Sequence, residues 1–306
     1  MKTSLWWAVL AVAVSGCGPT DAQLGDFEDE VGGDLAELST RSRTYVQLRR
    51  DARRCVSPRC GGFWVHDVNR VALNEQYVSG LDFSASGLSD EVQADVYSAP
   101  EGEVILYGKL GAEEAQFHTR PFLVTSAWRG MPGVEPATGE LFYKVAAVNV
   151  QCFVAPCPTL KATKLHSTAA TLATGLDTSR ASLPRVDDAW LEGRVRNKGA
   201  LVAGKFRPGS SVGINRELVL DASQVFVKLP DRTQSCPRPA MLRCPAGKVV
   251  AMQRNADRCV MPAGCVEPGA CAAYVPSCAA GYSLVSWTGG VHACQQYACD
   301  PEFLFD

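Results

Sequence analysis

The sequence lacks the patterns by which most metal, nucleotide and redox sites are recognised. It contains no Cys-x-x-Cys, no His-Glu-x-x-His and no glycine-rich phosphate loop. The few histidines stand apart, without ligand spacing, at His66, His118, His166 and His292. A structural zinc site and a nucleotide site therefore have little support. We expect no cofactor, no metal and no enzymatic activity.

An excess of charge and long apolar runs are also missing. The chain has 30 Lys and Arg against 32 Asp and Glu, a formal net charge of −2, and no basic tract. A nucleic-acid partner is therefore not expected. After the N-terminal segment no apolar run approaches the roughly 18 residues that a transmembrane helix needs.

The N-terminal segment predicts export. Met1-Lys2 precedes an apolar stretch over residues 5–14, and Val14-Ser15-Gly16-Cys17 has the form of a bacterial lipobox. We interpret residues 1–17 as a lipoprotein signal peptide with Cys17 as the lipidated residue; an ordinary secretory signal is the alternative. The lipid makes the membrane a partner and predicts anchoring to the bacterial cell envelope, at the outer membrane. The acidic residues 18–43 predict a flexible tether, with a short amphipathic helix over 27–38 as the alternative.

Export changes the interpretation of the remaining cysteines. Thirteen cysteines less Cys17 leave twelve, an even number, and an oxidising compartment favours disulfides over metal or redox sites. Two pairs have the spacing Cys-x4-Cys, Cys55-Cys60 and Cys152-Cys157, and we expect each to close a disulfide. A redox-active dithiol is the alternative; Arg53, Arg54 and Arg59 surround only the first pair, so the shared feature is structural.

The same two pairs mark an internal repeat. Cys55 and Cys152 are 97 positions apart, Gly80-Leu81-Asp82 returns as Gly175-Leu176-Asp177, and Phe122-Leu123-Val124 matches Leu218-Val219-Leu220. We therefore predict two copies of one β-rich domain, over 44–135 and 141–232.

Short β-branched and aromatic stretches predict the strands. They lie at 45–49, 62–68, 104–110 and 122–128, and again at 142–150, 160–165, 200–206, 218–220 and 224–229. One helix is expected in each copy, capped by Ser89 and by Ser182 with Pro184. The fold class is mainly β (α+β): two small antiparallel barrel or sheet domains with one helix each, followed by two disulfide-rich modules.

Eight cysteines from Cys236 onward form these two modules, over 233–267 and 268–306. Each is too small to fold on an apolar core alone, so disulfides are expected to replace it. Four cysteines allow three connectivities, which the sequence leaves open, although we favour pairing within each module. The two sets are Cys236, Cys244, Cys259 and Cys265, and Cys271, Cys278, Cys294 and Cys299.

A resemblance to a known group of proteins rests on several of these segments. The Tyr45-Val-x-Leu-Arg opening, the Cys-x4-Cys-Gly-Gly-Phe-Trp-Val segment that follows it, and the ending around Gly281-Tyr282-Ser283 resemble uncharacterised lipoproteins of myxobacterial type. The resemblance implies a cell-envelope location and brings no assigned activity. The second copy departs from it, because Pro158-Thr159-Leu160 stands where Gly61-Gly62-Phe63 stood.

Three classes of function remain open. The first is a non-catalytic protein that binds an envelope component or an extracellular protein or glycan. The second is a protease inhibitor acting through the C-terminal modules, with Lys248, Arg254 and Arg258 in a long loop. The third is a hydrolase; the pattern Gly209-Ser210-Ser211-Val212-Gly213 fits a nucleophile elbow, but Pro208 and the absence of a following helical pattern favour a surface loop. Asp82 and Asp177, each followed by a serine two positions later, favour turns over a calcium site.

Overall fold

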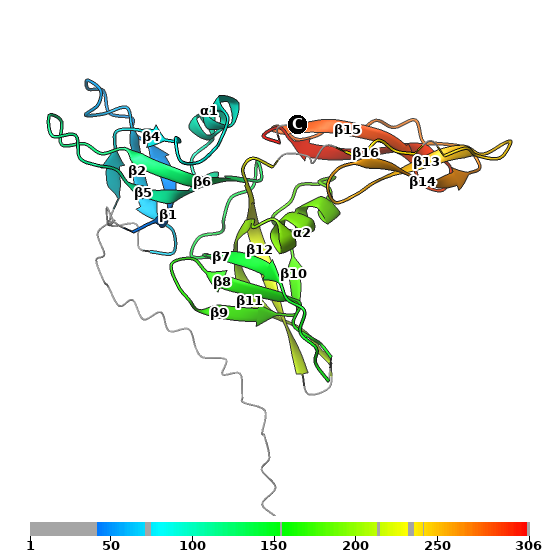
Figure 1. Ribbon diagram of the computed structural model, residues 1–306. Helices are drawn as coiled ribbons and strands as arrows, with labels where there is room; N and C mark the ends of the chain where they lie inside the picture. The colour runs from blue at the N-terminus through cyan, green and yellow to red at the C-terminus, as the bar shows by residue number, and fades with distance from the viewer. Residues whose placement is uncertain are drawn as a thin grey trace, which may run out of the picture. The chain divides into compact units, whose positions relative to one another are not determined.

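The computed structural model describes residues 42–70, 75–153, 155–212, 215–231, 236–240 and 242–304 (Figure 1). Cys17 and the tether as far as residue 41 lie outside these ranges, so the lipobox and the acidic segment remain predictions. No helix among the described residues is long and apolar enough to cross a membrane.

Two β-rich segments have the same order of elements. The first β segment, residues 44–135, contains β1 (Thr44–Arg50), β2 (Phe63–Asp67), β3 (Gln76–Val78), β4 (Leu81–Asp82), α1 (Asp90–Ser98), β5 (Val104–Leu110) and β6 (Phe122–Gly130). The second β segment, residues 141–232, contains β7 (Leu141–Ala147), β8 (Leu160–Lys164), β9 (Ala170–Ala173), β10 (Gly175–Asp177), α2 (Asp188–Asn197), β11 (Leu201–Val212) and β12 (Asn215–Lys228). The mainly β prediction with one helix in each segment is confirmed.

The strands of both segments join in one 12-stranded sheet, which the sequence did not predict. Its main path runs β3-β2-β1-β5-β6-β12-β11-β7-β8-β9, with β4 added to β6 and β10 added to β12 in parallel. Read outward from the β6–β12 pair, the strands follow corresponding orders: β6-β5-β1-β2-β3 in the first segment and β12-β11-β7-β8-β9 in the second. Pairing β6 with β12 covers two edges that would otherwise expose unpaired backbone groups.

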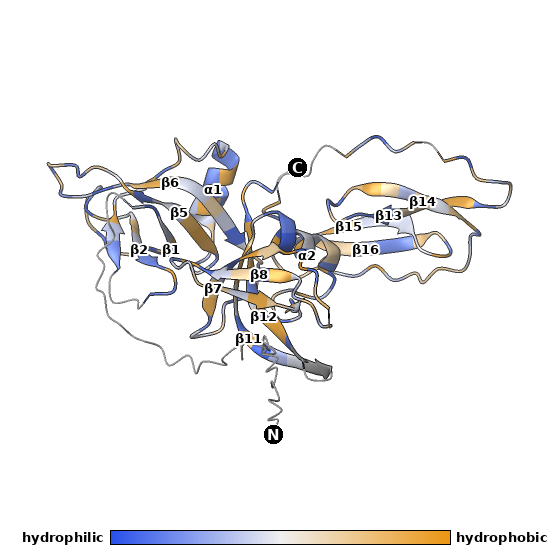
Figure 2. Ribbon diagram, turned by 60° about the horizontal axis from the view of Figure 1, so that its bottom comes forward, coloured by the Kyte–Doolittle hydropathy of each residue, from blue (hydrophilic) through white to orange (hydrophobic). Residues whose placement is uncertain are grey.

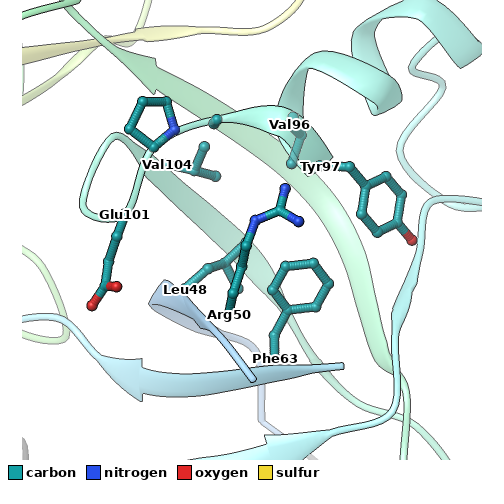
Figure 3. A pocket seen from close by; sticks show the side chains of 9 residues that line it. Leu48, Arg50, Phe63, Val96, Tyr97, Glu101 and Val104 are labelled. Carbon is teal, nitrogen blue, oxygen red and sulfur yellow. The ribbon is translucent and has the colours of Figure 1, made fainter. Parts of the chain in front are cut away.

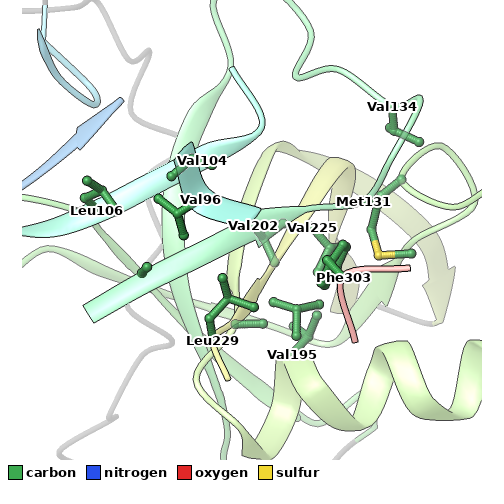
Figure 4. Packing of buried hydrophobic residues seen from close by; sticks show 14 of the residues in the cluster. Val96, Val104, Leu106, Met131, Val134, Val195, Val202, Val225, Leu229 and Phe303 are labelled. Carbon is green, nitrogen blue, oxygen red and sulfur yellow. The ribbon is translucent and has the colours of Figure 1, made fainter. Parts of the chain in front are cut away.

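Alternating burial explains the outer strands. In β1 and β2 every second side chain is buried and the ones between are half-exposed, as a sheet with one face on the core requires. A single apolar cluster takes side chains from both helices and both segments, including Val96, Val195, Leu106 and Val202 (Figure 4). In Figure 2 part of β12 is drawn in the hydrophobic colour, in keeping with the buried residues 220–227 of this strand.

One helix begins at the capping residue expected from the sequence and the other does not. Ser89 occupies the N-cap of α1, but its side chain makes no capping hydrogen bond. The N-cap of α2 is Asp187 and not Ser182, since the Asp187 side chain accepts a hydrogen bond from the backbone N–H of Trp190. Trp190 is fully buried beneath this cap, so the cap and the core contact fix the start of α2 together.

The two segments also exchange hydrogen bonds in a reciprocal way. The carbonyl oxygen of Tyr45 accepts from Val68 N in its own segment and lies 3.1 Å from His166 Nε2 of the other. The carbonyl oxygen of Phe142 accepts from Leu165 N in its own segment and from Asn69 Nδ2, at 2.8 Å, of the other. A second apolar cluster lies around these contacts: Val68, Ile105, Trp128, Phe142, Leu165, Leu201, Ala203 and Phe226.

The C-terminal modules contribute a separate 4-stranded sheet, β14-β13-β15-β16. Its strands are β13 (Val249–Arg254), β14 (Val260–Val266), β15 (Tyr282–Gly289) and β16 (Cys294–Pro301). The disulfides join the first cysteine of each module to the third and the second to the fourth: Cys236–Cys259, Cys244–Cys265, Cys271–Cys294 and Cys278–Cys299. By chain entropy each bond contributes about 3 kcal/mol to a module that has few buried apolar residues.

Candidate interaction loops

The two Cys-x4-Cys segments form disulfide-closed loops at matching places in the sheet. Cys55–Cys60 closes the connection between β1 and β2, and Cys152–Cys157 closes the connection between β7 and β8. In each loop the residue after the first cysteine is an exposed apolar side chain, Val56 at 84% and Phe153 at 108% relative exposure. An apolar side chain displayed on a closed loop is available for contact with a partner.

The Asp51 carboxylate, directly after β1, supports the backbone of the first loop. It accepts hydrogen bonds from Arg53 N at 3.1 Å, from Arg53 Nε at 2.9 Å and from Gly61 N at 3.3 Å, so it ties the two ends of the loop together. The hydrogen bond from the Arg53 side chain, with smaller contributions from these backbone groups, lowers the pKa of Asp51 to about 2. The carboxylate is therefore ionised at every physiological pH.

Tyr77 holds the same loop from β3. Its hydroxyl donates to Pro58 O at 2.8 Å and accepts from Gly62 N at 3.3 Å. The Arg53 guanidinium lies 4.9 Å from the ring centres of both Tyr77 and Trp64, within cation–π range. The loop is thus fixed by a disulfide, a carboxylate, a phenol and a stacked guanidinium.

Gly61 and Gly62 are required by this geometry. Gly61 has φ +84°, and a Cβ on Gly62 would lie 2.0 Å from Val78 O. In the second segment the matching strand carries Thr159, so the close approach is absent there, although Val148 N still donates to Thr159 O as Asp51 N does to Gly62 O. The backbone pairing is shared, and the support of the loop is not.

The surface of the first loop is basic. Arg54 and Arg59 are exposed on either side of Val56. Arg49 is paired with Glu75 on the neighbouring face of the sheet. The exposed part of the loop therefore offers an apolar side chain flanked by two guanidinium groups, and arginine is enriched among the residues that contribute most to protein–protein binding.

A small cavity lies beside this region, between β1, β2 and the end of α1 (Figure 3). Arg50 reaches over Phe63 at 6.0 Å, with Leu48, Val96 and Tyr97 around them. Its volume is about 60 Å³, against the roughly 300 Å³ at which small-molecule sites begin. It has room for water rather than for a substrate.

The two aspartates with a following serine form turns, as predicted. Asp82 Oδ1 accepts from Ser84 N at 2.9 Å, and Asp177 Oδ1 accepts from Ser179 N at 3.0 Å. Hydrogen bonds from the backbone and side chain of Ser84 lower the pKa of Asp82, and those from the side chain and backbone of Ser179, with Arg207, lower the pKa of Asp177. Among the described residues no group of His, Cys, Asp and Glu has the arrangement of a metal site.

The basic residues considered for protease inhibition have different surroundings from those expected. Arg254 ends β13 with its side chain 5% exposed and forms ion pairs with Asp187 and Asp300, and Arg258 is buried beside Asp300. An inhibitory arginine has to reach into a protease pocket, so these two arginines do not fill that role; Lys248 remains exposed. Arg254 instead links the first module to the N-cap of α2, and both arginines link it to β16 of the second module.

The segment considered as a nucleophile elbow also differs from expectation. Residues 209–212 continue β11 in extended conformation and are followed by β12, so they belong to a hairpin rather than to a surface loop or a strand-to-helix turn. Gly213 lies outside the described residues. The strand-to-helix geometry that exposes a catalytic serine is not formed by the residues described.

The fold and the loops together define a disulfide-bonded, mainly β protein in which two β segments share one sheet. The chain matches the Domain of unknown function (DUF6748) over residues 44–232, and it belongs to that family. The match begins and ends where the two β segments do. An uncharacterized protein of Dictyostelium discoideum is 23% identical over 270 residues, which cover 86% of this chain and 89% of that protein. No solved structure matches significantly.

Proposed function

We propose that the protein is exported, anchored to the bacterial cell envelope by a lipid on Cys17, and acts there as a non-catalytic binding protein. The lipobox and the resemblance to uncharacterised lipoproteins of myxobacterial type support the location. The partner is an envelope component or an extracellular protein or glycan, and the anchoring membrane is the outer membrane.

The observation that carries the binding role is the support of the Cys55–Cys60 loop. Four separate interactions fix a loop whose exposed residues include Val56, Arg54 and Arg59. A loop that is already rigid loses little conformational entropy on binding, so more of its contact energy appears as affinity.

The two β segments are, in this proposal, copies of one unit. They share the element order, the loop disulfide and the reciprocal Asn69 and His166 contacts. At the junction Arg129 pairs with Val227, which occupy matching places in β6 and β12. An axis through this pair relates the segments as an isologous interface relates two subunits.

Site-specific photo-crosslinking in native envelopes tests the binding role. A photoreactive residue at position 56 is expected to give a discrete crosslinked product, and the same residue at exposed Glu91 of α1 serves as the control. Adding Arg54→Gln and Arg59→Gln should reduce that product several-fold. The proposal fails if position 56 labels the same mixture as position 91, or if the arginine changes leave the product unaltered.

The anchor is tested separately. Cys17→Ala is expected to move the protein from the membrane fraction to the soluble fraction, and metabolic labelling with a palmitate analogue should be lost in parallel. Retention in the membrane fraction with unchanged labelling would remove the lipid anchor from the proposal. Neither result depends on the loop.

A further inference from the structure

A larger cavity lies where both β segments meet the C-terminal end of α2. Its volume is about 420 Å³, within the range of small-molecule sites. Thr125 and Ser126 of β6 form one wall, Arg194 and Lys198 of α2 a second, and the chain from Val227 to Asp231 a third. Ser86 and Asp257 complete the lining.

Both acidic groups of this cavity are paired with the same arginine. The Arg194 guanidinium is 3% exposed, with Nε 2.6 Å from Asp231 Oδ1 and Nη1 3.3 Å from Asp257 Oδ1. Asp231 also accepts a hydrogen bond from Trp190 Nε1 at 3.1 Å. Both carboxylates are thus committed to groups of the wall, which leaves no acidic site for a cation ligand.

Two lysines of the lining have no ion-pair partner among the described residues. Lys198 and Lys228 form no salt bridge with any residue that the structure describes, and both are exposed. Lys228 Nζ lies 6.0 Å from the ring centre of Trp128, whose Nε1 donates to the carbonyl of Gly199, next to Lys198. Trp128 therefore links the regions of the two lysines. With Arg194, Asp231 and Asp257, the lining has one net positive charge.

We infer that this cavity binds a small polyhydroxylated anion, of the class of sugar acids and sugar phosphates. The two ammonium groups attract the anionic group, and the hydroxyls of Thr125 and Ser126 can exchange hydrogen bonds with the hydroxyls of the ligand. Val227 and Leu229 also line the cavity but are only 1% and 3% exposed, so the polar groups carry the recognition. The cavity is lined by residues other than those of the Cys55–Cys60 loop, so this inference is independent of the binding role proposed for that loop.

Isothermal titration calorimetry of the full chain tests the inference, with glucuronate and glucose 6-phosphate as probes. Glucose and inorganic phosphate, at matched ionic strength, separate the contributions of the hydroxyls and the anionic group. At least one probe is expected to bind at millimolar concentration or below, and glucose and inorganic phosphate more weakly. Loss of two charge-assisted contacts in Lys198→Gln/Lys228→Gln should weaken binding about tenfold or more.

Control variants keep the result interpretable. Lys205→Gln removes an exposed lysine of β11 elsewhere on the sheet and should leave the affinity within about twofold, as for surface charges away from a site. Thr125→Val, which removes one hydroxyl of the wall, should weaken both probes. Absence of heat with both probes, equal binding of inorganic phosphate, or unchanged affinity in the double lysine variant would each overturn the inference. Arg54→Gln should not alter the titration, whatever its effect on crosslinking.

Discussion

The two disulfide loops show how one scaffold carries two different surfaces. Below the first loop lie Asp51, Arg53, Trp64 and Tyr77; the matching positions of the second segment hold Val148, Val150, Lys161 and Leu172. The hydrogen-bonded and stacked support of the first loop therefore has no counterpart built from the same residue types. The basic, internally supported surface belongs to the first segment alone.

The second loop has the more apolar surface. Two apolar side chains are exposed there, Phe153 fully and Val150 at 42%. In the first loop, by contrast, Cys60 is buried beneath the supporting side chains. Because the strands that flank both loops pair in the same way, the difference lies in the side chains of the loops and of the residues that support them. Binding specificity can therefore change at such loops without any cost to the shared core.

The shared features should respond equally to substitution, and the largest effects are expected at two glycines. Both β5–β6 and β11–β12 change register at a glycine, Gly108 and Gly204, where an added Cβ would lie 2.1 Å from Leu123 O and 2.4 Å from Asp221 O. Gly108→Ala and Gly204→Ala should each lower the free energy of unfolding by about 3 kcal/mol or more. Urea denaturation of each variant measures this change in the free energy of unfolding.

Gly80→Ala is the matched control for this pair. An added Cβ there meets no atom within 4 Å, and its φ is not in the left-handed region. Its effect should stay within about 0.5 kcal/mol. A small effect at Gly108 or Gly204 would show that the two bulges do not hold the strands as closely as described.

The next effect concerns the reciprocal contacts between the segments. Asn69 accepts a hydrogen bond from Phe142 N at 2.7 Å and donates to Phe142 O and Leu165 O. Asn69→Ala leaves buried backbone groups unpaired and should cost about 2 kcal/mol. Asn69→Asp keeps the acceptor for Phe142 N but places a carboxylate oxygen against Phe142 O and Leu165 O, so it should cost at least as much as the alanine change when both are measured by urea denaturation. A clearly smaller cost would contradict the importance of the donated hydrogen bonds.

The sequence predicted the strands that alternate clearly and missed the short ones. β3, β4, β9 and β10 have two to four residues each, too few for a period of two to be recognised. The match of Phe122 with Leu218 was wrong by two positions, because β4 places Leu81 beside Phe122 while β10 places Leu176 beside Leu220. A shift of two keeps every side chain on its own face, so the apolar pattern could not detect it.

The cysteine positions of the two modules indicate how the disulfides pair. Successive spacings differ between the modules, but the first and third cysteines are 23 residues apart in both, and the second and fourth are 21 apart in both. The other two pairings give separations that differ. The buried partners of Arg254 could not be found in this way, because Asp187 and Asp300 meet it only through tertiary packing.

Removing each loop disulfide would sharpen the comparison of the loops. Cys55→Ser/Cys60→Ser and Cys152→Ser/Cys157→Ser should each cost about 2 kcal/mol, the chain-entropy value for so short a loop. Hydrogen exchange of the loop amides should separate them: Asp51 and Tyr77 should preserve protection in the first loop, and protection in the second should fall. Equal loss of protection in both loops would contradict the internal support of the first loop. Asp51→Asn should lower the protection of the first loop toward that of the second.

The smallest expected effect is the pH dependence that one substitution in the reciprocal contacts introduces. His166 stands where the first segment has Asn69, and burial lowers its pKa; burial also lowers the pKa of His66. The unfolded chain therefore takes up protons first as the pH falls below about 6.5, so stability is full above that value and declines below it. His166→Asn should keep the hydrogen bond to Tyr45 O and remove part of the decline, by less than about 1 kcal/mol between pH 7.5 and 5.5.

His66→Gln should remove a further part, since its ring lies on the opposite face of the sheet from the core and makes a separate contact with Gln47. Urea denaturation at the two pH values decides the matter, and an unchanged decline in His166→Asn would mean that the imidazole is not held neutral at the junction of the two segments.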